Sequence, residues 1–297
     1  MAKKTPEPAT NAAGWKPTET SKKKAGRYRL IAWILWIVAI ALEAVAIFWL
    51  LRQREEVGGT GLVRDADTGL LESQNVTYEF QQWAFITLLV AFVVIGALSI
   101  IGSQLWKKAN RLDPAKQSET VKFFVQNQLG AIVAIIAFLP LIIFVLLNKD
   151  MSGSQKGIAG AIGGVIAITA VALGIDFDPP SVEQYTADQS TVIQLLGKDE
   201  VVWSAGGGVY HVCAEVPDIA NATTEVTTGT TAEAIEAGKS RLTLEFASEL
   251  ATCELPVPTN SAEIADAIRA IRDGATDTLL PAPVFEDGVT PPFVPAS

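Results

Sequence analysis

The chain has few of the residues that most often carry out chemistry. Its 297 residues include one histidine, His211, and two cysteines, Cys213 and Cys253. No CxxC pair occurs, and the run Gly206-Gly207-Gly208 lacks the Lys and Ser/Thr of a phosphate-binding loop. We find no catalytic motif. The sequence therefore favours a non-enzymatic protein, and we expect no cofactor and no nucleic-acid partner.

Charge is almost absent from four long apolar stretches. A helix needs about 20 apolar residues to cross a bilayer core that is roughly 30 Å thick. The four stretches have about this length: Leu30–Leu51, Trp83–Trp106, Leu129–Asn148 and Gly157–Ile175. The fourth is the weakest because it is rich in Gly and Ala. Five of the seven Trp residues lie near the stretch ends, where bilayers favour amphipathic rings: Trp33, Trp36, Trp49, Trp83 and Trp106. The sequence predicts a multi-pass membrane protein with four transmembrane helices.

The distribution of Lys and Arg predicts the orientation in the cell membrane. Eight precede the first stretch and five lie between residues 107 and 128, whereas the other two loops hold three and two. The positive-inside rule then places the N-terminus in the cytoplasm, and four spans return the C-terminal domain to the same side. The region after residue 175 has five Lys and Arg against twenty acids. Acids contribute little to topology, so we keep this orientation.

Composition divides the chain into four parts. Residues 1–29 are basic and rich in Thr and Pro, and we expect them to be disordered. Residues 30–175 form the transmembrane domain, residues 176–280 a small acidic α+β domain, and residues 281–297 a Pro-rich tail. In the α+β domain, Ser181 is placed to cap a helix over 182–196, and a second helix runs from Ser261 to a stop at Gly274. Two β-rich runs around Gly206-Gly207-Gly208 indicate a hairpin.

Glu43 is the one ionisable residue inside the four apolar stretches. A carboxylate at that depth costs a few kcal/mol, so it should face protein or water. One interpretation is a proton-linked or cofactor-contacting acid, which would suit a transport or signalling component. The other is a structural hydrogen bond between helices, which we favour because no Lys, Arg or His lies in any of the stretches.

His211, Cys213 and Cys253 are the candidate residues of the C-terminal domain. Together they supply three ligands of a type that zinc accepts, although the spacing is not that of a common zinc motif. In an extracytoplasmic domain the two cysteines would form a disulfide. In the cytoplasmic domain predicted here they are expected to be reduced thiols, and we expect no bound metal.

The fourth apolar stretch has a face of small residues. Gly157, Gly160, Gly163 and Gly164 lie along it, and Gly160 and Gly164 satisfy the GxxxG pattern that allows helices to approach closely. The sequence predicts that this helix packs against other helices. These can belong to the same chain, to a second copy, or to a partner protein.

The order of segments resembles a family of uncharacterised actinobacterial multi-pass membrane proteins. The similar segments are WKKANRLDPAKQSETVKFFVQNQLGAI, the NKDM turn, DFDPPSVEQYT and WSAGGGVYHVC with GTTAEAIEAGKSRLTLE. Small membrane proteins of this type accompany respiratory supercomplexes as accessory subunits. The resemblance implies the same architecture and an accessory or scaffold role beside other membrane subunits. A membrane-tethered metal or thiol module at His211, Cys213 and Cys253 is an alternative.

Overall fold

A computed structural model describes residues 14–57, 62–64, 67–73 and 77–292. The chain divides into two compact units. The helical unit comprises residues 28–107 and 127–177, and the terminal unit comprises residues 1–27, 108–126 and 178–297. Each unit is described by itself.

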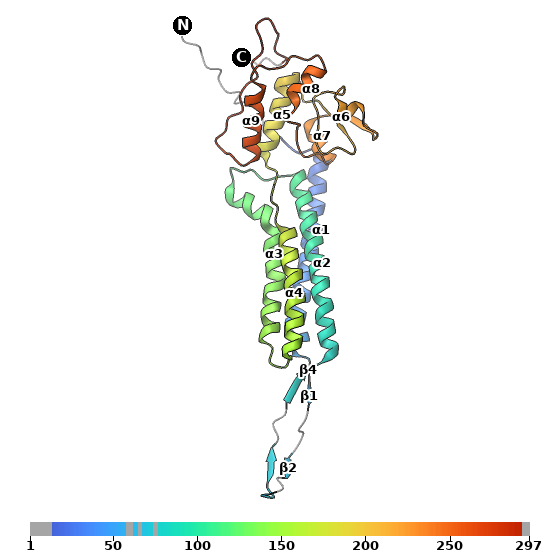
Figure 1. The fold of residues 1–297 in the computed structure, drawn as a ribbon, viewed down its shortest axis with the longest axis vertical. Helices are drawn as coiled ribbons and strands as arrows, with labels where there is room; N and C mark the ends of the chain where they lie inside the picture. The colour runs from blue at the N-terminus through green and yellow to red at the C-terminus, as the bar shows by residue number, and fades with distance from the viewer. Residues whose placement is uncertain (1–13, 58–61, 65–66, 74–76, 293–297) are drawn as a thin grey trace. The chain divides into compact units, whose positions relative to one another are not determined.

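Four long helices form the helical unit and run side by side (Figure 1). They are α1 (Glu19–Phe48), α2 (Gln82–Leu112), α3 (Thr120–Leu147) and α4 (Gly153–Gly174). All four are long and apolar enough to cross a membrane. Each contains one of the predicted apolar stretches almost entirely, and α1, α2 and α3 extend beyond theirs by residues that belong to the terminal unit. The prediction of four helices with the length and apolar composition of membrane spans is confirmed.

The interior of the bundle is made by large apolar side chains from α2 and α3 that meet small ones from α1 and α4. Phe92 and Phe138 stack with ring centroids 6.3 Å apart. Buried Ala side chains, among them Ala39 and Ala159, lie in the same core. Small residues let the backbones approach closely, which is the main source of packing between helices in lipid.

Aromatic residues form two clusters along the bundle, one at the middle of α1 and one just after its end. Trp33, Trp36 and Trp106 form one cluster, with centroids 5.4 to 6.2 Å apart. Trp49 and Trp83 form a second, 6.0 Å apart. The Arg29 guanidinium lies 5.8 Å from the Trp106 ring centroid. Trp33, Trp49 and Trp83 are exposed, as aromatic rings at a membrane interface would be, whereas Trp36 and Trp106 are buried in the bundle.

The loops of the helical unit hold its helix ends in place. A short 3-10 turn, Leu50–Arg52, follows α1, and two antiparallel strand pairs join it to α2: β1 (Arg54–Val57) with β4 (Thr77–Phe80), and β2 (Leu62–Arg64) with β3 (Leu71–Ser73). Asn148, in the short turn between α3 and α4, donates to the carbonyl of Leu51 over 2.8 Å. Ser152 and Gln155 form a capping box that starts α4.

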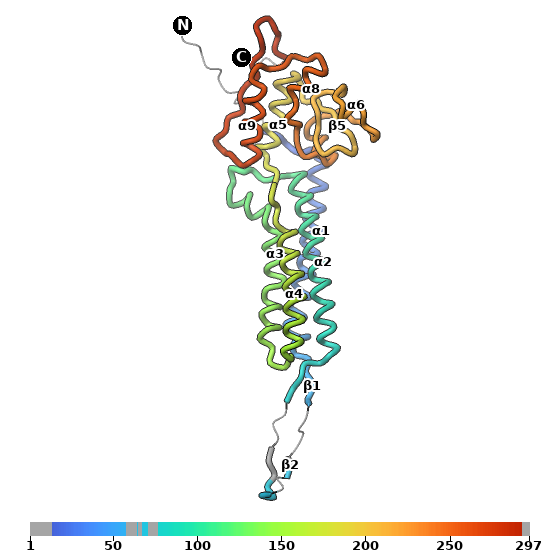
Figure 2. Tube along the Cα trace, in the orientation of Figure 1, coloured from blue at the N-terminus to red at the C-terminus, as the bar shows by residue number. Residues whose placement is uncertain are grey.

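The terminal unit gathers three separate segments of the chain around one core. Its helices are α5 (Val182–Leu196), α6 (Pro217–Ala220), α7 (Thr231–Glu236), α8 (Phe246–Thr252) and α9 (Ser261–Arg272). Strands β5 (Val201–Ser204) and β6 (Val226–Gly229) pair antiparallel. Helix α5 packs beside α9 (Figure 2). The expected α+β character is therefore found, with more helix than strand.

Local signals were accurate for the two longer helices of this unit. The Ser181 hydroxyl accepts from the backbone N–H of Gln184, as a cap should. Helix α9 ends just before Gly274, whose φ of +104° suits glycine. The predicted hairpin is reduced to one bridge between Val202 and His211, and the four-residue pairing of β5 is with β6.

The prediction of a disordered N-terminal segment is wrong for its described part, residues 14–29; residues 1–13 lie outside the described residues. Helix α1 begins at Glu19. Trp15 is only 3% exposed, and its ring centroid lies 4.8 Å from that of Tyr185 in α5. Its backbone N–H donates to Thr186 over 3.0 Å. Composition could not reveal this, because the partner surface lies 170 residues further along the chain.

The boundary predicted at residue 176 lies within two residues of the start of the C-terminal part of the terminal unit, whereas the unit has no boundary at residue 280 and contains further segments. The terminal unit includes residues 108–126, and the Val182 N–H donates to the carbonyl of Ala115 over 3.2 Å. The described part of the Pro-rich tail is attached to the start of α9: Asn260 accepts from the N–H of Val284 over 2.9 Å. Residues 293–297 lie outside the described residues. The domain is therefore larger than the stretch that composition marked.

Candidate functional sites

Glu43 lies inside the helical bundle. Its side chain projects from α1 with 4% exposure, and its Oε1 atom has no hydrogen-bond partner among the described residues. The backbone of Leu141 is the hydrogen-bonding neighbour of the carboxyl. Leu141 follows Pro140, which removes a hydrogen bond from the interior of α3. The acid thus has a backbone hydrogen-bonding neighbour in α3, which favours the structural interpretation.

Helix α4 has two different faces of small residues. The buried face consists of Ala159, Gly163, Ala170 and Gly174. A Cβ at Gly163 would lie 2.8 Å from the Phe92 ring, so this glycine is required by packing. At Gly160 a Cβ would meet Leu146 at 3.4 Å, an ordinary contact. Of the glycines predicted to pack, only Gly163 is therefore closely packed within the chain.

Gly157 and Gly164 lie on the outward side of α4. A Cβ at either would have nothing within 4 Å. The GxxxG pair of Gly160 and Gly164 is thus not the contact face within this chain. Pattern alone could not distinguish the two faces, because small residues occur on both.

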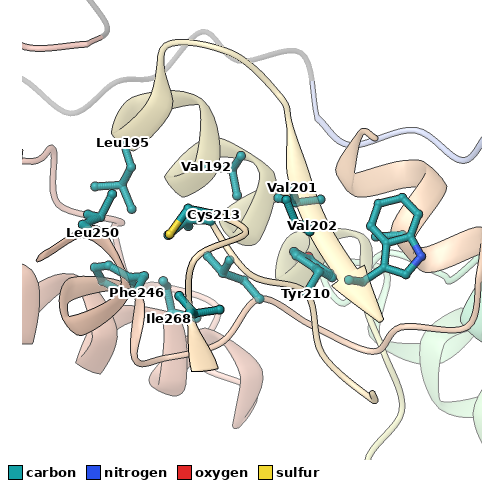
Figure 3. Close-up of a cluster of buried hydrophobic side chains, with 14 of the residues drawn as sticks. Val192, Leu195, Val201, Val202, Tyr210, Cys213, Phe246, Leu250 and Ile268 are labelled. Atoms are coloured by element: carbon teal, nitrogen blue, oxygen red, sulfur yellow. The ribbon is translucent and has the colours of Figure 1, made fainter. Parts of the chain in front are cut away.

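Cys213 and Cys253 are joined by a disulfide, with Cα atoms 6.6 Å apart. The expectation of two reduced thiols is therefore wrong for this structure. Cys213 is in the buried core of the terminal unit (Figure 3), and Cys253 follows α8 with partial exposure. The Oε2 atom of Glu215 lies 3.1 Å from Cys253 Sγ. The ligand atoms of the two cysteines and Glu215 all lie within 4.8 Å of one another.

His211 does not join the two cysteines. Its Nδ1 atom lies 2.7 Å from Oε1 of Glu249 in α8, and both residues are buried. The other oxygen of Glu249 accepts from the N–H of Val212 over 3.1 Å. The alternative in which His211, Cys213 and Cys253 form one ligand group is therefore not supported by the geometry, because His211 pairs with Glu249 and the two sulfurs are bonded to each other. Glu215, two residues after Cys213, is the acid that lies beside the disulfide.

The glycine-rich loop binds a lysine ammonium. Lys239, only 5% exposed, donates from Nζ to three carbonyl oxygens: Ser204 at 2.7 Å, Ala205 at 3.1 Å and Gly207 at 2.6 Å. Burial lowers the pKa of this amine. Carbonyl oxygens, not N–H groups, face the centre of the loop. It is therefore built for a cation, and the cation is supplied by the chain itself.

A buried charged cluster links α5 and α9. Asp188 is fully buried and pairs with Arg272 over 2.9 Å. Its other oxygen accepts from the Tyr210 hydroxyl over 3.1 Å and from the Leu242 N–H over 2.9 Å. Burial, followed by the neighbouring Asp188 charge, raises the pKa of Tyr210 well above its ordinary value. The phenol therefore stays a neutral donor, and the cluster serves the fold.

Comparison with known proteins does not identify a family. No protein-family model, no curated protein and no solved structure matches the chain. The resemblance to actinobacterial membrane proteins stays an expectation.

Proposed function

We propose that this is a non-enzymatic membrane protein of four spans that serves as an accessory subunit, with the outward face of α4 packed against a transmembrane helix of a larger membrane complex. The observation that carries the proposal is this outward face, which combines small residues with an adjoining apolar groove.

The outward face of α4 comprises five residues spaced at i, i+4, i+7, i+11 and i+15: Gly157, Ala161, Gly164, Ile168 and Ala172. Ile168 is 71% exposed, and α4 is the least buried of the four helices. A groove of about 340 Å³ between α3 and α4 adjoins it and is lined by apolar side chains, including those of Ile168 and Ala172. Small residues bring little bulk to a lipid-facing surface, but they allow a second helix to approach closely.

The terminal unit supports an arrangement with both chain ends on one side. Residues 14–27, residues 108–126 and the C-terminal segment belong to one compact unit, so they have to share one side of a membrane. Two pairs of apolar helices connect these segments: α1 and α2 form the first pair, and α3 and α4 form the second. Thirteen Lys and Arg flank the spans on that side against five on the other. The positive-inside rule makes it the cytoplasmic side.

The polar content of the spans argues against a transporter. A transport pathway normally needs ionisable residues and broken helices that line water. In this chain Glu43 is the only ionisable residue in the four apolar stretches, and the bundle buries it. An accessory role requires no such pathway.

Purification of the tagged full chain from its native membrane in mild detergent tests the proposal. The wild type should bring down a defined set of membrane subunits in constant ratio. Gly164→Leu should abolish that association and leave the thermal stability of the isolated chain unchanged, because the added side chain meets open space within the chain.

Ile162→Leu is the matched control, since it changes the shape of an exposed residue on the same helix but off the outward face. It should retain the associated subunits. Equal association for Gly164→Leu and the wild type would contradict the proposal. Recovery of only a second, differently tagged copy of the chain would also contradict it, because the face would then be a homomeric contact.

A further inference from the structure

We propose that a pocket at the start of α2 and α4 binds the headgroup of a membrane phospholipid that carries a primary ammonium, that is, a phosphoethanolamine group. The inference rests on the membrane-spanning role proposed above for the four long helices. It assigns a ligand site to the helical unit. The site depends neither on which side of the membrane the pocket faces nor on the outward face of α4.

The pocket lies at the end of the bundle where β1 and β4 join the helices (Figure 1). Its volume of about 510 Å³ is within the range of about 300–1,000 Å³ that is usual for small-molecule sites. The first turns of α2 and α4, the end of β4 and the turn between α3 and α4 line it. Trp83, in the first turn of α2, is 46% exposed, as suits a ring at the headgroup level of a bilayer. Lipid headgroups are therefore the molecules that surround this pocket.

The lining of the pocket offers charged groups of both signs. The carboxylates of Glu79 and Asp150 can accept hydrogen bonds, and the ammonium of Lys149 can donate them. Arg54 approaches the Asp150 carboxylate only to 3.9 Å, so that carboxylate keeps lone pairs for a ligand. Hydroxyl and amide groups complete the polar part of the lining: Gln82, Ser152, Ser154 and Gln155.

This lining distinguishes headgroups by their charge and their donors. A primary ammonium has three N–H donors for carboxylates, whereas the quaternary ammonium of choline has none. An anionic headgroup without an ammonium would meet two carboxylates and one lysine, and like charges in contact are unfavourable. A phosphoethanolamine group satisfies both signs, because its ammonium donates to Glu79 and Asp150 and its phosphate accepts from Lys149.

The turn that carries Lys149 and Asp150 is held in position without a ligand. The side-chain oxygen of Asn148 accepts from the N–H of Asp150 over 2.9 Å and from that of Met151 over 3.1 Å. The carbonyl of Asp150 accepts from the N–H of Phe80 over 2.8 Å, and the Met151 side chain is buried in the bundle core. A pocket with fixed walls loses less conformational freedom when it binds a ligand.

Apolar side chains continue the lining toward the apolar stretches of the helices. Phe85 lies one turn into α2, and Ile158, which is 45% exposed, lies in the second turn of α4. These side chains are placed to contact the first part of an acyl chain when the headgroup occupies the polar part. The site therefore favours a whole lipid over a soluble molecule with the same headgroup.

The test uses the full chain, delipidated in mild detergent, and native mass spectrometry with three lipids that differ only in headgroup: phosphatidylethanolamine, phosphatidylcholine and phosphatidylglycerol. The wild type should bind phosphatidylethanolamine at least about 10-fold more tightly than the other two, the ratio expected for one hydrogen bond between charged groups. Free phosphoethanolamine at the same concentration should not displace the lipid, because it lacks acyl chains.

Variants of the lining separate the two parts of the headgroup. The double variant Glu79→Gln, Asp150→Asn should bind phosphatidylethanolamine no more tightly than phosphatidylcholine. Lys149→Gln should weaken the binding of both lipids by a similar factor, because both carry the phosphate. Glu56→Gln is the matched control: it is an exposed acid of β1 that lies opposite Tyr78 and not opposite Glu79, and it should keep the wild-type preference.

Three results would overturn the proposal. Equal binding of the three lipids by the wild type would mean that the pocket holds only unselected boundary lipid. A preference that persists in the double variant would mean that the carboxylates do not bind the ammonium. Glu79→Gln alone, at an exposed residue, decides this point if the double variant does not fold. Displacement by free phosphoethanolamine would mean that the ligand is a soluble molecule. None of these results would affect the co-purification test on α4.

Discussion

Glu43 is buried in the bundle, and its carboxyl has the backbone of Leu141 as a hydrogen-bonding neighbour. We expect Glu43→Gln to fold and insert normally, because an amide still serves the backbone of Leu141. Glu43→Leu should lower the free energy of unfolding by about 1 kcal/mol, since it removes the hydrogen bond between the carboxyl and that backbone. Thermal unfolding in detergent compares the two variants. Loss of a proton-coupled activity in Glu43→Gln, with assembly normal, would show that the carboxylate has more than a structural role.

Glu236 gives the terminal unit a dependence on pH. It accepts from the Thr18 hydroxyl over 2.5 Å and from Lys24 Nζ over 2.9 Å. These contacts, the Thr18 hydrogen bond first, lower the pKa of Glu236 below its ordinary value of 4.5. Because the folded pKa is the lower one, the stabilisation is fully present above pH 4.5 and is lost as pH falls through the folded value.

Comparison of Glu236→Gln with the wild type measures this effect. At about pH 6 the wild type should be more stable by up to about 1 kcal/mol, a small value because Lys24 is half exposed. The difference should vanish at about pH 3. Denaturant unfolding at both values, with Glu225→Gln as the exposed control, provides the measurement. A difference that persists in acid would mean that the carboxylate charge is not involved.

The candidate residues show how far single positions can be read from a sequence. Burial of Glu43 was predictable because a carboxylate in an apolar stretch has to avoid lipid. The partner of His211 was not, since Glu249 is 38 residues away and nothing local distinguishes it from other acids. Lys239 was missed for a similar reason: its three carbonyl partners lie 32 to 35 residues earlier.

Helix α4 carries the clearest prediction at the scale of an element. Gly163→Leu should lower the stability of the helical unit by about 1–3 kcal/mol, because even its Cβ would lie 2.8 Å from the Phe92 ring. Gly157→Leu should be neutral in the isolated chain, since open space surrounds that position. Detergent stability curves of the two variants give the comparison. Equal tolerance would place Phe92 away from α4.

Elements were predictable where one local signal decides their existence. Apolar length marked α1 to α4, and caps or glycine stops marked α5 and α9 to within a residue or two. Strand pairing was not predictable in the same way. The run that begins at Val201 has two suitable partners, and pairing with Val226–Gly229 gives four residue pairs where the adjacent run gives a single bridge.

At the scale of the whole molecule, the N-terminal segment completes the core of the terminal unit. Trp15 is 3% exposed, and its Thr18 and Lys24 neighbours hold Glu236. Trp15→Ala should therefore destabilise this unit by about 3–5 kcal/mol. Limited proteolysis of the full chain under increasing denaturant would detect it. Trp49→Ala, at a Trp that is 54% exposed, is the control and should leave the terminal unit unchanged.

The set of segments that fold together was less predictable than the boundaries between them. Composition changes at residues 29 and 176, within two residues of the edges of the units, but it did not reveal that the terminal unit joins segments from three parts of the chain. A single buried Trp in a polar segment has little weight in any compositional average. The Trp side chain nevertheless brings distant segments together, because a large apolar ring is stable only when it packs against another part of the chain.

The sidedness of the membrane arrangement is the last prediction, and a matched pair of exposed leucines tests it. Leu70, in the loop between α1 and α2, is 67% exposed, and Leu279, in the terminal unit, is 68% exposed. Each is changed to Cys in a chain whose two native cysteines are Ser. In intact cells an impermeant maleimide should label Leu70→Cys and leave Leu279→Cys unlabelled, because the segments rich in Lys and Arg stay inside. Both should react after permeabilisation. Labelling of Leu279→Cys in intact cells would reverse the orientation, and the Cys213–Cys253 disulfide would then be the stable state of an extracytoplasmic domain.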